Sequence, residues 1–273
     1  MTKVLAALDN SLAAKPVLQT AVALGGLLDA EVDPVHVPVD GDRVARATAA
    51  AEGLALRIVT GPVAQRLLEE GRQDEVVAAV VGARGTPAGP KPLGHTALAL
   101  ATSLPKPVVV VPPDIRRPGK LRRVLAPVEG GVELTPTAII ELARGADLDV
   151  VVLHVLEEAA LPAFTDQPQH EQGAWAREFL LRYCPWGIGS ARLEVRVGRA
   201  EDLVAPVAHE TDSDIIALGW TQEVAEHRAP VVRAVLARAQ VPVMLVPVQL
   251  SRTAADQAQR EEEAWNSLRL SRA

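Results

Sequence analysis

The chain has 273 residues, of which 48% are hydrophobic and only 3% aromatic, so its core must be built from Val, Leu, Ala and Ile. The formal net charge of −6 argues against broad electrostatic binding to nucleic acid or to an anionic membrane. The single cysteine, Cys184, excludes an internal disulfide and fits a reducing compartment. No apolar run approaches the roughly 18 residues of a membrane span, and Asp9 follows too few apolar residues for a signal peptide. We therefore expect a cytoplasmic protein with neither nucleic acid nor membrane as a partner.

Short apolar runs alternate with helical patterns along the first part of the chain. We expect strands at Val4–Leu8, Glu31–Val37, Leu54–Val59, Val76–Val81 and Pro107–Pro112, and helices near Ser11–Leu28, Arg43–Glu52 and Gly94–Ser103. Near-continuous apolar strands separated by helices are typical of a parallel sheet that is covered on both faces.

The second part of the chain repeats this series. RRVLAPVEG at 122–130 echoes TKVLAALDN at 2–10, and the two endings, LPKPVVVVP at 104–112 and AQVPVMLVP at 239–247, match best. A repeat at this scale indicates two copies of one domain. We predict an α/β protein with two tandem Rossmann-like domains, each an open five-stranded parallel sheet in the order 3-2-1-4-5 with helices on both faces. The predicted parts are a domain at 1–113, a linker at 114–121, a domain at 122–248 and a C-terminal helical tail at 249–273.

The second half carries an extra amphipathic segment in which Trp175, Phe179 and Tyr183 recur at helical spacing, where the first half has only the brief Arg43–Glu52. We interpret this segment as helix core rather than as a ligand site.

The linker between the halves is basic. Its charges fit a solvated connector or an anion contact.

A loop rich in Gly and Pro follows the fourth strand, in the stretch VVGARGTPAGPKPLGHT at 80–96. In the order 3-2-1-4-5 the winding reverses above the carboxyl ends of strands 1 and 4, which is where such sheets bind ligands. Gly82 and Gly85 allow backbone N–H groups to approach an anion, and Arg84 adds positive charge. Gly94, at the far end of the loop, opens a helix whose free N–H groups favour a phosphate. The alternative is a solvated connecting loop in which Gly and Pro only interrupt regular secondary structure.

The loop matches neither the P-loop pattern nor the G-x-G-x-x-G dinucleotide fingerprint. It resembles the Gly-x2-Gly-x9-Gly-Ser/Thr nucleotide motif of the universal stress protein family. Gly82 and Gly85 match in place, and Gly94 matches with eight intervening residues instead of nine. The resemblance extends to Asp9-Asn10-Ser11 after strand 1, to His36-Val37 after strand 2 and to the closing Pro-Val-Val-Val-Val, and it covers nearly the whole chain twice.

This resemblance implies a HUP-type fold that binds ATP or a related adenine nucleotide, with or without Mg²⁺. Asp9 and Val37 would lie at the adenosine end. The phosphates would meet the glycine loop, where His95 stands in place of the family's Ser or Thr and Thr96 offers a hydroxyl one position later; the implied phosphate-end residues are Gly82, Arg84, Gly85, Gly94, His95 and Thr96. The implied function is a nucleotide-responsive module that acts in stress response or signalling through its conformation or its choice of partner.

The second half departs from the motif. Trp220-Thr221-Gln222-Glu223 follows Gly219, so the second glycine is missing, and an indole beside carboxylates is poorly suited to a triphosphate. We therefore interpret the second domain as structural and without a nucleotide.

Several alternatives stay open at this point. The chain also fits a ligand-free tandem scaffold. A slow ATPase is the weakest of the three functions, because His95, a candidate base, has no nucleophile paired with it in the sequence. Asp9 suits a helix cap or a turn as well as a ligand contact. His36 and His154 end apolar strands, which favours satisfied buried histidines over metal ligands, and no cluster has metal-ligand spacing.

The fifth strand of each domain lies at a sheet edge. Val108–Val111 and Val243–Val246 are both apolar, and an exposed apolar edge invites aggregation. The resemblance implies that the two edges pair antiparallel around a pseudo-twofold axis, as an intramolecular counterpart of a family dimer. A homodimer of whole chains is also left open.

Overall fold

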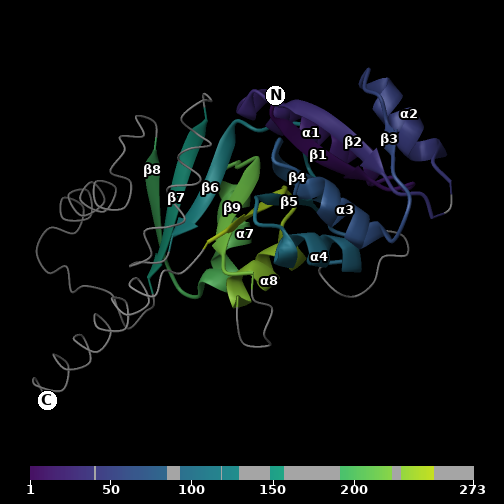
Figure 1. Ribbon diagram of the computed structural model, residues 1–273. Coiled ribbons are helices and arrows are strands. Elements are labelled where there is room, and N and C mark those ends of the chain that lie inside the picture. Colours follow the sequence, from purple (N-terminus) through teal and green to yellow (C-terminus); the bar gives the residue numbers. More distant parts are fainter. Residues whose placement is uncertain are drawn as a thin grey trace, which may run out of the picture.

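The structure is a computed structural model, and it describes residues 1–39, 41–84, 93–117, 119–128, 148–156, 191–222 and 229–248. Helices and strands alternate along the first half (Figure 1). They are β1 (Lys3–Leu8), α1 (Ala14–Leu28), β2 (Glu31–His36), α2 (Arg43–Ala51), β3 (Arg57–Ile58), α3 (Val63–Gly71), β4 (Val76–Gly82), α4 (His95–Ser103) and β5 (Val108–Val111). The described elements of the second half are β6 (Arg123–Val128), β7 (Asp149–Leu156), β8 (Arg192–Val197), α7 (Ala200–Glu210), β9 (Ile215–Trp220), α8 (Pro230–Arg238) and β10 (Val243–Pro247).

The strands of each half follow the predicted order. The sheet runs β3-β2-β1-β4-β5-β10-β9-β6-β7-β8, so both halves read 3-2-1-4-5 from their outer edge to the middle. All pairs within a half are parallel. The predicted α/β fold with two similar, mostly parallel halves is confirmed.

The two halves meet through their fifth strands. β5 and β10 pair antiparallel, with Val110 opposite Val243, Val109 opposite Met244 and Val108 opposite Leu245. The apolar edges that the sequence exposes in each half are therefore covered by one another within the chain, which removes the edge that would otherwise invite association. β5 does not pair with β6, the strand that follows it in the chain.

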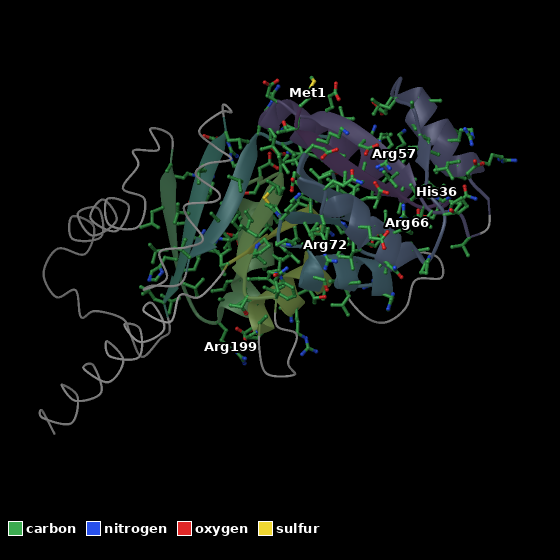
Figure 2. All side chains as sticks on the ribbon, in the orientation of Figure 1. Met1, His36, Arg57, Arg66, Arg72 and Arg199 are labelled. Atoms are coloured by element: carbon green, nitrogen blue, oxygen red, sulfur yellow. The ribbon has the colours of Figure 1, made fainter. Side chains whose placement is uncertain are left out.

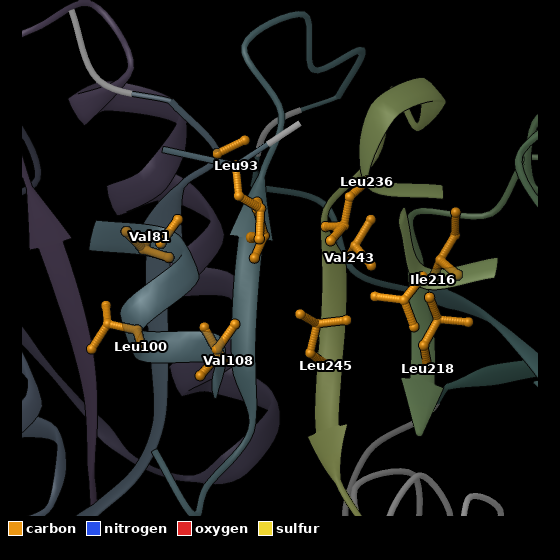
Figure 3. Close-up of a cluster of buried hydrophobic side chains, with 14 of the residues drawn as sticks. Val81, Leu93, Leu100, Val108, Ile216, Leu218, Leu236, Val243 and Leu245 are labelled. Carbon is orange, nitrogen blue, oxygen red and sulfur yellow. The ribbon is translucent and has the colours of Figure 1, made fainter. Parts of the chain in front are cut away.

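Aliphatic layers cover both faces of this sheet. One layer joins the sheet to α3, α4, α7 and α8, and the other joins it to α1 and α2. Figure 1 shows these two sets of helices on opposite sides of the strands. The first layer runs without a break across the middle of the sheet, where Val108 and Leu245 lie side by side (Figure 3). The core therefore belongs to both halves at once.

Local chemistry shifts some element ends from their predicted positions. Helix α1 begins at Ala14 rather than near Ser11, because Asp9 Oδ1 accepts hydrogen bonds from Ser11 N (3.1 Å) and Ser11 Oγ (2.6 Å) and holds a turn there. Strand β3 has two residues instead of the six expected from Leu54 to Val59, since only Arg57 and Ile58 pair with β2. The predicted helix at Gly94–Ser103 is present as α4, with Gly94 as its N-cap.

The linker is held against the second half along its described residues. Arg116 N donates to Gln240 O (2.9 Å), and Arg117 pairs with Asp212 (2.8 Å). The pairing with Arg117 lowers the pKa of the Asp212 carboxyl. Among the described helices, none is long and apolar enough to cross a membrane.

Some predictions fall on residues outside the described ranges. They concern Gly85, Cys184, the amphipathic segment with Trp175, Phe179 and Tyr183, and the tail at 249–273. The domain boundaries at 113, 121 and 248 also stay predictions.

Candidate functional site

A cleft of about 650 Å³ opens at the carboxyl ends of β1, β2 and β4 in the first half. Its walls come from the turn after β1, the residues that end β2, the end of β4 and the first turn of α4. This is the point where the winding of the sheet reverses, as the strand order requires. Figure 2 shows the side chains of this region, with His36 labelled at the β2 end.

The cleft collects the site residues that the sequence predicted. Gly85 lies outside the described residues, and all the others line the cleft: Asp9, Val37, Gly82, Arg84, Gly94, His95 and Thr96. They come from four separate segments of the chain, which the fold brings together. Whether they bind a ligand stays a prediction.

At one end of the cleft, Asp9 shapes the turn between β1 and α1. Its Oδ1 accepts two hydrogen bonds from Ser11, and Ser11 Oγ accepts one from Ala13 N (3.1 Å). Asn10 Oδ1 accepts a hydrogen bond from Val44 N (2.7 Å) and so ties this turn to the start of α2. Asp9 therefore acts as a turn residue, the alternative left open above, while it still lines the cleft.

His36 fixes the loop beside this turn. The residue is 3% exposed, with Nδ1 2.8 Å from the carbonyl oxygen of Leu8 and Nε2 2.8 Å from that of Gly41. Each ring nitrogen thus faces a backbone carbonyl, and a neutral ring donates to one of the two. His36 is therefore a buried histidine held by the backbone, in agreement with its interpretation from the sequence. His36 also shapes the apolar end of the cleft, where Val37 is buried and Val39 is exposed.

His154 is the corresponding residue of the second half. Its Nδ1 lies 3.4 Å from the carbonyl oxygen of Val128. Burial lowers the pKa of His154, and the hydrogen bond to Val128 opposes this effect.

At the other end of the cleft, α4 presents its N-terminus. Gly94 N donates to Ala83 O (2.7 Å), which ties the helix start to the end of β4. Gly94 has an extended backbone, and within the described residues no side chain caps the helix. The first-turn N–H groups of α4 therefore face the cleft with the positive end of the helix dipole, which is a favourable environment for an anion.

The absence of a side chain at Gly82 leaves volume in the cleft. A Cβ at this position would meet Val17 Cγ2 at 3.6 Å and Ala13 Cβ at 3.7 Å, which are ordinary contacts. Because Val17 and Ala13 also line the cleft, a side chain at 82 would occupy its volume.

Arg84 lies between this cleft and the second half. It lines both the main cleft and a separate cavity of about 150 Å³ that α8 and the linker complete. Its Nε is buried and has no hydrogen-bond partner within the described part of the chain. A buried guanidinium nitrogen without a partner is costly, so this group is suited to receive an acceptor.

The loop after the corresponding strand of the second half contacts the first half instead. Trp220 is buried, and its Nε1 donates to the carbonyl oxygen of Ala101 in the first half (3.2 Å). Gln222 Nε2 donates to the carbonyl oxygens of Ala101 (3.1 Å) and Leu104 (2.8 Å). Sequence reasoning found these residues unsuited to a triphosphate but missed their contact with the first half, for which a local pattern carries no signal.

A doubly wound sheet with a cleft at its switch point defines a Rossmann-like α/β protein. Residues 120–247 match the model of the universal stress protein family, which is the family that the sequence resembles. The match falls on the half whose glycine motif is incomplete, so it does not depend on that motif.

The first two of the following solved structures share the fold over nearly the full length of this chain. A functionally unknown protein from Pseudomonas aeruginosa is 16% identical, with a TM-score of 0.63 over 90% of this chain and 92% of that one. A universal stress protein from Archaeoglobus fulgidus is 15% identical, with a TM-score of 0.63 over 90% of this chain and 96% of that one. The universal stress protein from Archaeoglobus fulgidus in complex with dAMP aligns with 46% of this chain and 97% of its own, at 18% identity and a TM-score of 0.32. Among curated proteins, none matches the chain.

Proposed function

We propose that the cleft of the first half binds ATP or a related adenine nucleotide. The protein then acts as a module in the cytoplasm that transmits the bound state to stress response or signalling through its conformation or its partners. The second half binds no nucleotide in this proposal, because Trp220 occupies the position that follows the strand glycine.

The observation that carries the proposal is the juxtaposition of two features: a helix N-terminus that no described side chain caps, and an open cleft with an apolar end. The α4 N-terminus and Arg84 suit phosphates, and Val37, Leu8 and Val63 suit a purine. A volume of about 650 Å³ lies within the range of small-molecule sites. In this proposal Asp9, which lines the cleft, stands at the adenosine end.

Mg²⁺ belongs to this proposal only as a companion of the phosphates. Within the described residues, no group of three His, Cys, Asp or Glu side chains could hold a metal ion. A divalent ion would therefore take most of its ligands from the nucleotide and from water.

A second candidate function is a ligand-free tandem scaffold. The use of Trp220 and Gln222 as contacts between the halves favours it, since these residues serve assembly in place of binding. Both candidates share the same fold and differ in whether the first cleft is used.

Equilibrium binding of ATP, ADP, AMP and adenosine to the purified chain separates the two. We expect binding of one nucleotide per chain, with an affinity that falls as phosphates are removed, because α4 and Arg84 contribute only to the phosphate end. The absence of binding by all four compounds at millimolar concentration would leave the scaffold as the function. One-to-one binding with equal affinities for ATP and adenosine would contradict the role of α4.

A further inference from the structure

The altered loop of the second half contacts the helix that opens the cleft of the first. Trp220 and Gln222 are separated from Ala101 by 119 and 121 residues in sequence, and both donate to its carbonyl oxygen. Gln222 donates to Leu104 as well. Ala101 lies in the last turn of α4 and Leu104 is its C-cap, so the second half caps the C-terminus of the helix whose N-terminus lines the cleft.

These hydrogen bonds provide donors for carbonyl groups at the C-terminus of α4. The last carbonyl groups of an α-helix have no partner within the helix, and a buried carbonyl without a partner is destabilising. Leu100 and Ala101 are buried at this end of α4. Two side chains from the other half supply the missing donors, so the position of α4 depends on the contact between the halves.

The backbone conformation of Gln222 indicates that its side-chain hydrogen bonds are important for this contact. Its φ is +62°, in the left-handed region that is strained for a residue with a Cβ. Gln222 stands three residues after Gly219, as Gly85 stands three residues after Gly82, so a glycine would fit this backbone without cost. The two hydrogen bonds from its amide offset the strain, and a glycine could not make them.

The contact is one-sided, although the two halves share one topology. In the first half Ala83 follows the strand glycine where the second half has Trp220. Ala83 lines the cavity of about 150 Å³ between Arg84 and the end of α8, near Leu236 and Ala239. An indole thus fills one side of the interface while the other side stays hollow, and the filled side is the one that holds the ligand-facing helix.

We propose that Trp220 and Gln222 are positioning residues that hold α4, and hence its phosphate-facing N-terminus, in place from the second half. This inference rests on the proposed function, since it assigns the second half a role in binding by the first. It predicts that the contact affects the phosphate end of a nucleotide and not the adenosine end.

The test compares two conservative variants with one control. Gln222→Asn keeps the amide and tolerates a positive φ, but its shorter side chain cannot reach α4; Trp220→Phe keeps the buried ring and removes the donor. Thr221→Ala changes the exposed residue between them. For each we would measure ATP and adenosine affinities by calorimetry and amide hydrogen exchange across α4.

We expect Gln222→Asn to weaken ATP binding roughly fivefold, with adenosine binding and the Thr221→Ala control unchanged. Exchange should accelerate at residues 98–104 in Gln222→Asn and, to a smaller extent, in Trp220→Phe, where Gln222 still bonds Ala101.

Unchanged exchange across α4 in Gln222→Asn would overturn the inference, whether or not nucleotide binds. Equal weakening of ATP and adenosine binding would also overturn it, because that outcome indicates a general loss of structure. A wild-type chain that binds no nucleotide overturns the proposed function instead; faster α4 exchange in Gln222→Asn would then still support the positioning of the helix.

Discussion

Val109 of β5 lies directly opposite Met244 of β10, and the two side chains, 0% and 4% exposed, occupy the same apolar layer at the middle of the sheet. Because β5 and β10 come from different halves, this pair is at once an inter-strand contact and an interdomain contact. The stability of the whole chain should therefore be sensitive to changes at this position.

Replacing Val109 with Lys should separate the two halves. A lysine ammonium at this buried position has no carboxylate partner among the described residues of its layer, so we expect the free energy of unfolding to fall by roughly 3–4 kcal/mol. Urea denaturation would measure the loss, and limited proteolysis should show faster cleavage in the linker at 114–121. Val22→Lys, on the partly exposed side of α1, is the matched control. Equal unfolding midpoints in the two variants would show that the pairing of β5 with β10 contributes little.

Gly82→Ala should reduce nucleotide binding without unfolding the protein. The added methyl group meets its neighbours at 3.6 Å or more, so the fold accommodates it, while it takes volume from the cleft between β4 and α1. We expect ATP affinity to fall roughly tenfold, about 1.4 kcal/mol, with an unchanged melting temperature. Gly219→Ala, at the corresponding place in the second half, should leave the affinity as it is. Equal losses in both variants would argue against a site confined to the first half.

His36→Phe should destabilise the folded chain. It leaves the carbonyl groups of Leu8 and Gly41 without the ring nitrogens that now lie 2.8 Å from them, and we expect the free energy of unfolding to fall by about 2 kcal/mol. Guanidinium denaturation against wild type measures the loss, and Thr221→Ala, at an exposed position, is the control. Equal unfolding midpoints in His36→Phe and wild type would contradict the structural role of His36.

His154 should make the protein less stable as the solution becomes acidic. Burial lowers its pKa in the folded state below the ordinary value of 6.5, so the unfolded chain binds more protons than the folded one between these two pKa values. The free energy of unfolding is therefore insensitive to this group well above pH 6.5 and decreases as the pH falls through 6.5 toward the folded-state pKa. Unfolding measured from pH 7.5 to 5 should show a smaller decrease in His154→Gln than in wild type. Identical pH profiles would contradict a lowered pKa, which NMR titration of the ring would measure directly.

Much of the fold could be predicted from the sequence because it depends on local patterns and on general rules of chain topology. Apolar runs such as Val76–Val81 specify buried strands, and the similarity of the segments 104–112 and 239–247 reveals the second copy of the domain. The strand order then follows from right-handed crossovers. It places Asp9 and Gly82 together at the carboxyl ends of neighbouring strands. The positions that line the cleft could be named for the same reason, since each follows a strand or begins a helix.

Only the tertiary structure decided which groups these residues contact. The partners of His36 lie on β1 and on the loop before α2, and those of Trp220 and Gln222 lie more than a hundred residues away. Such contacts depend on register and on the packing of helices against a shared sheet, which leave no periodic trace in the chain. The glycine that is missing after Gly219 therefore indicated a lost ligand site, while the folded chain shows a side chain that caps α4 from the other half. The physical reason is that the partner of a backbone carbonyl group is determined by proximity in the folded chain. The sequence gives the identity of the donor residue, but it does not show which carbonyl group that residue will reach.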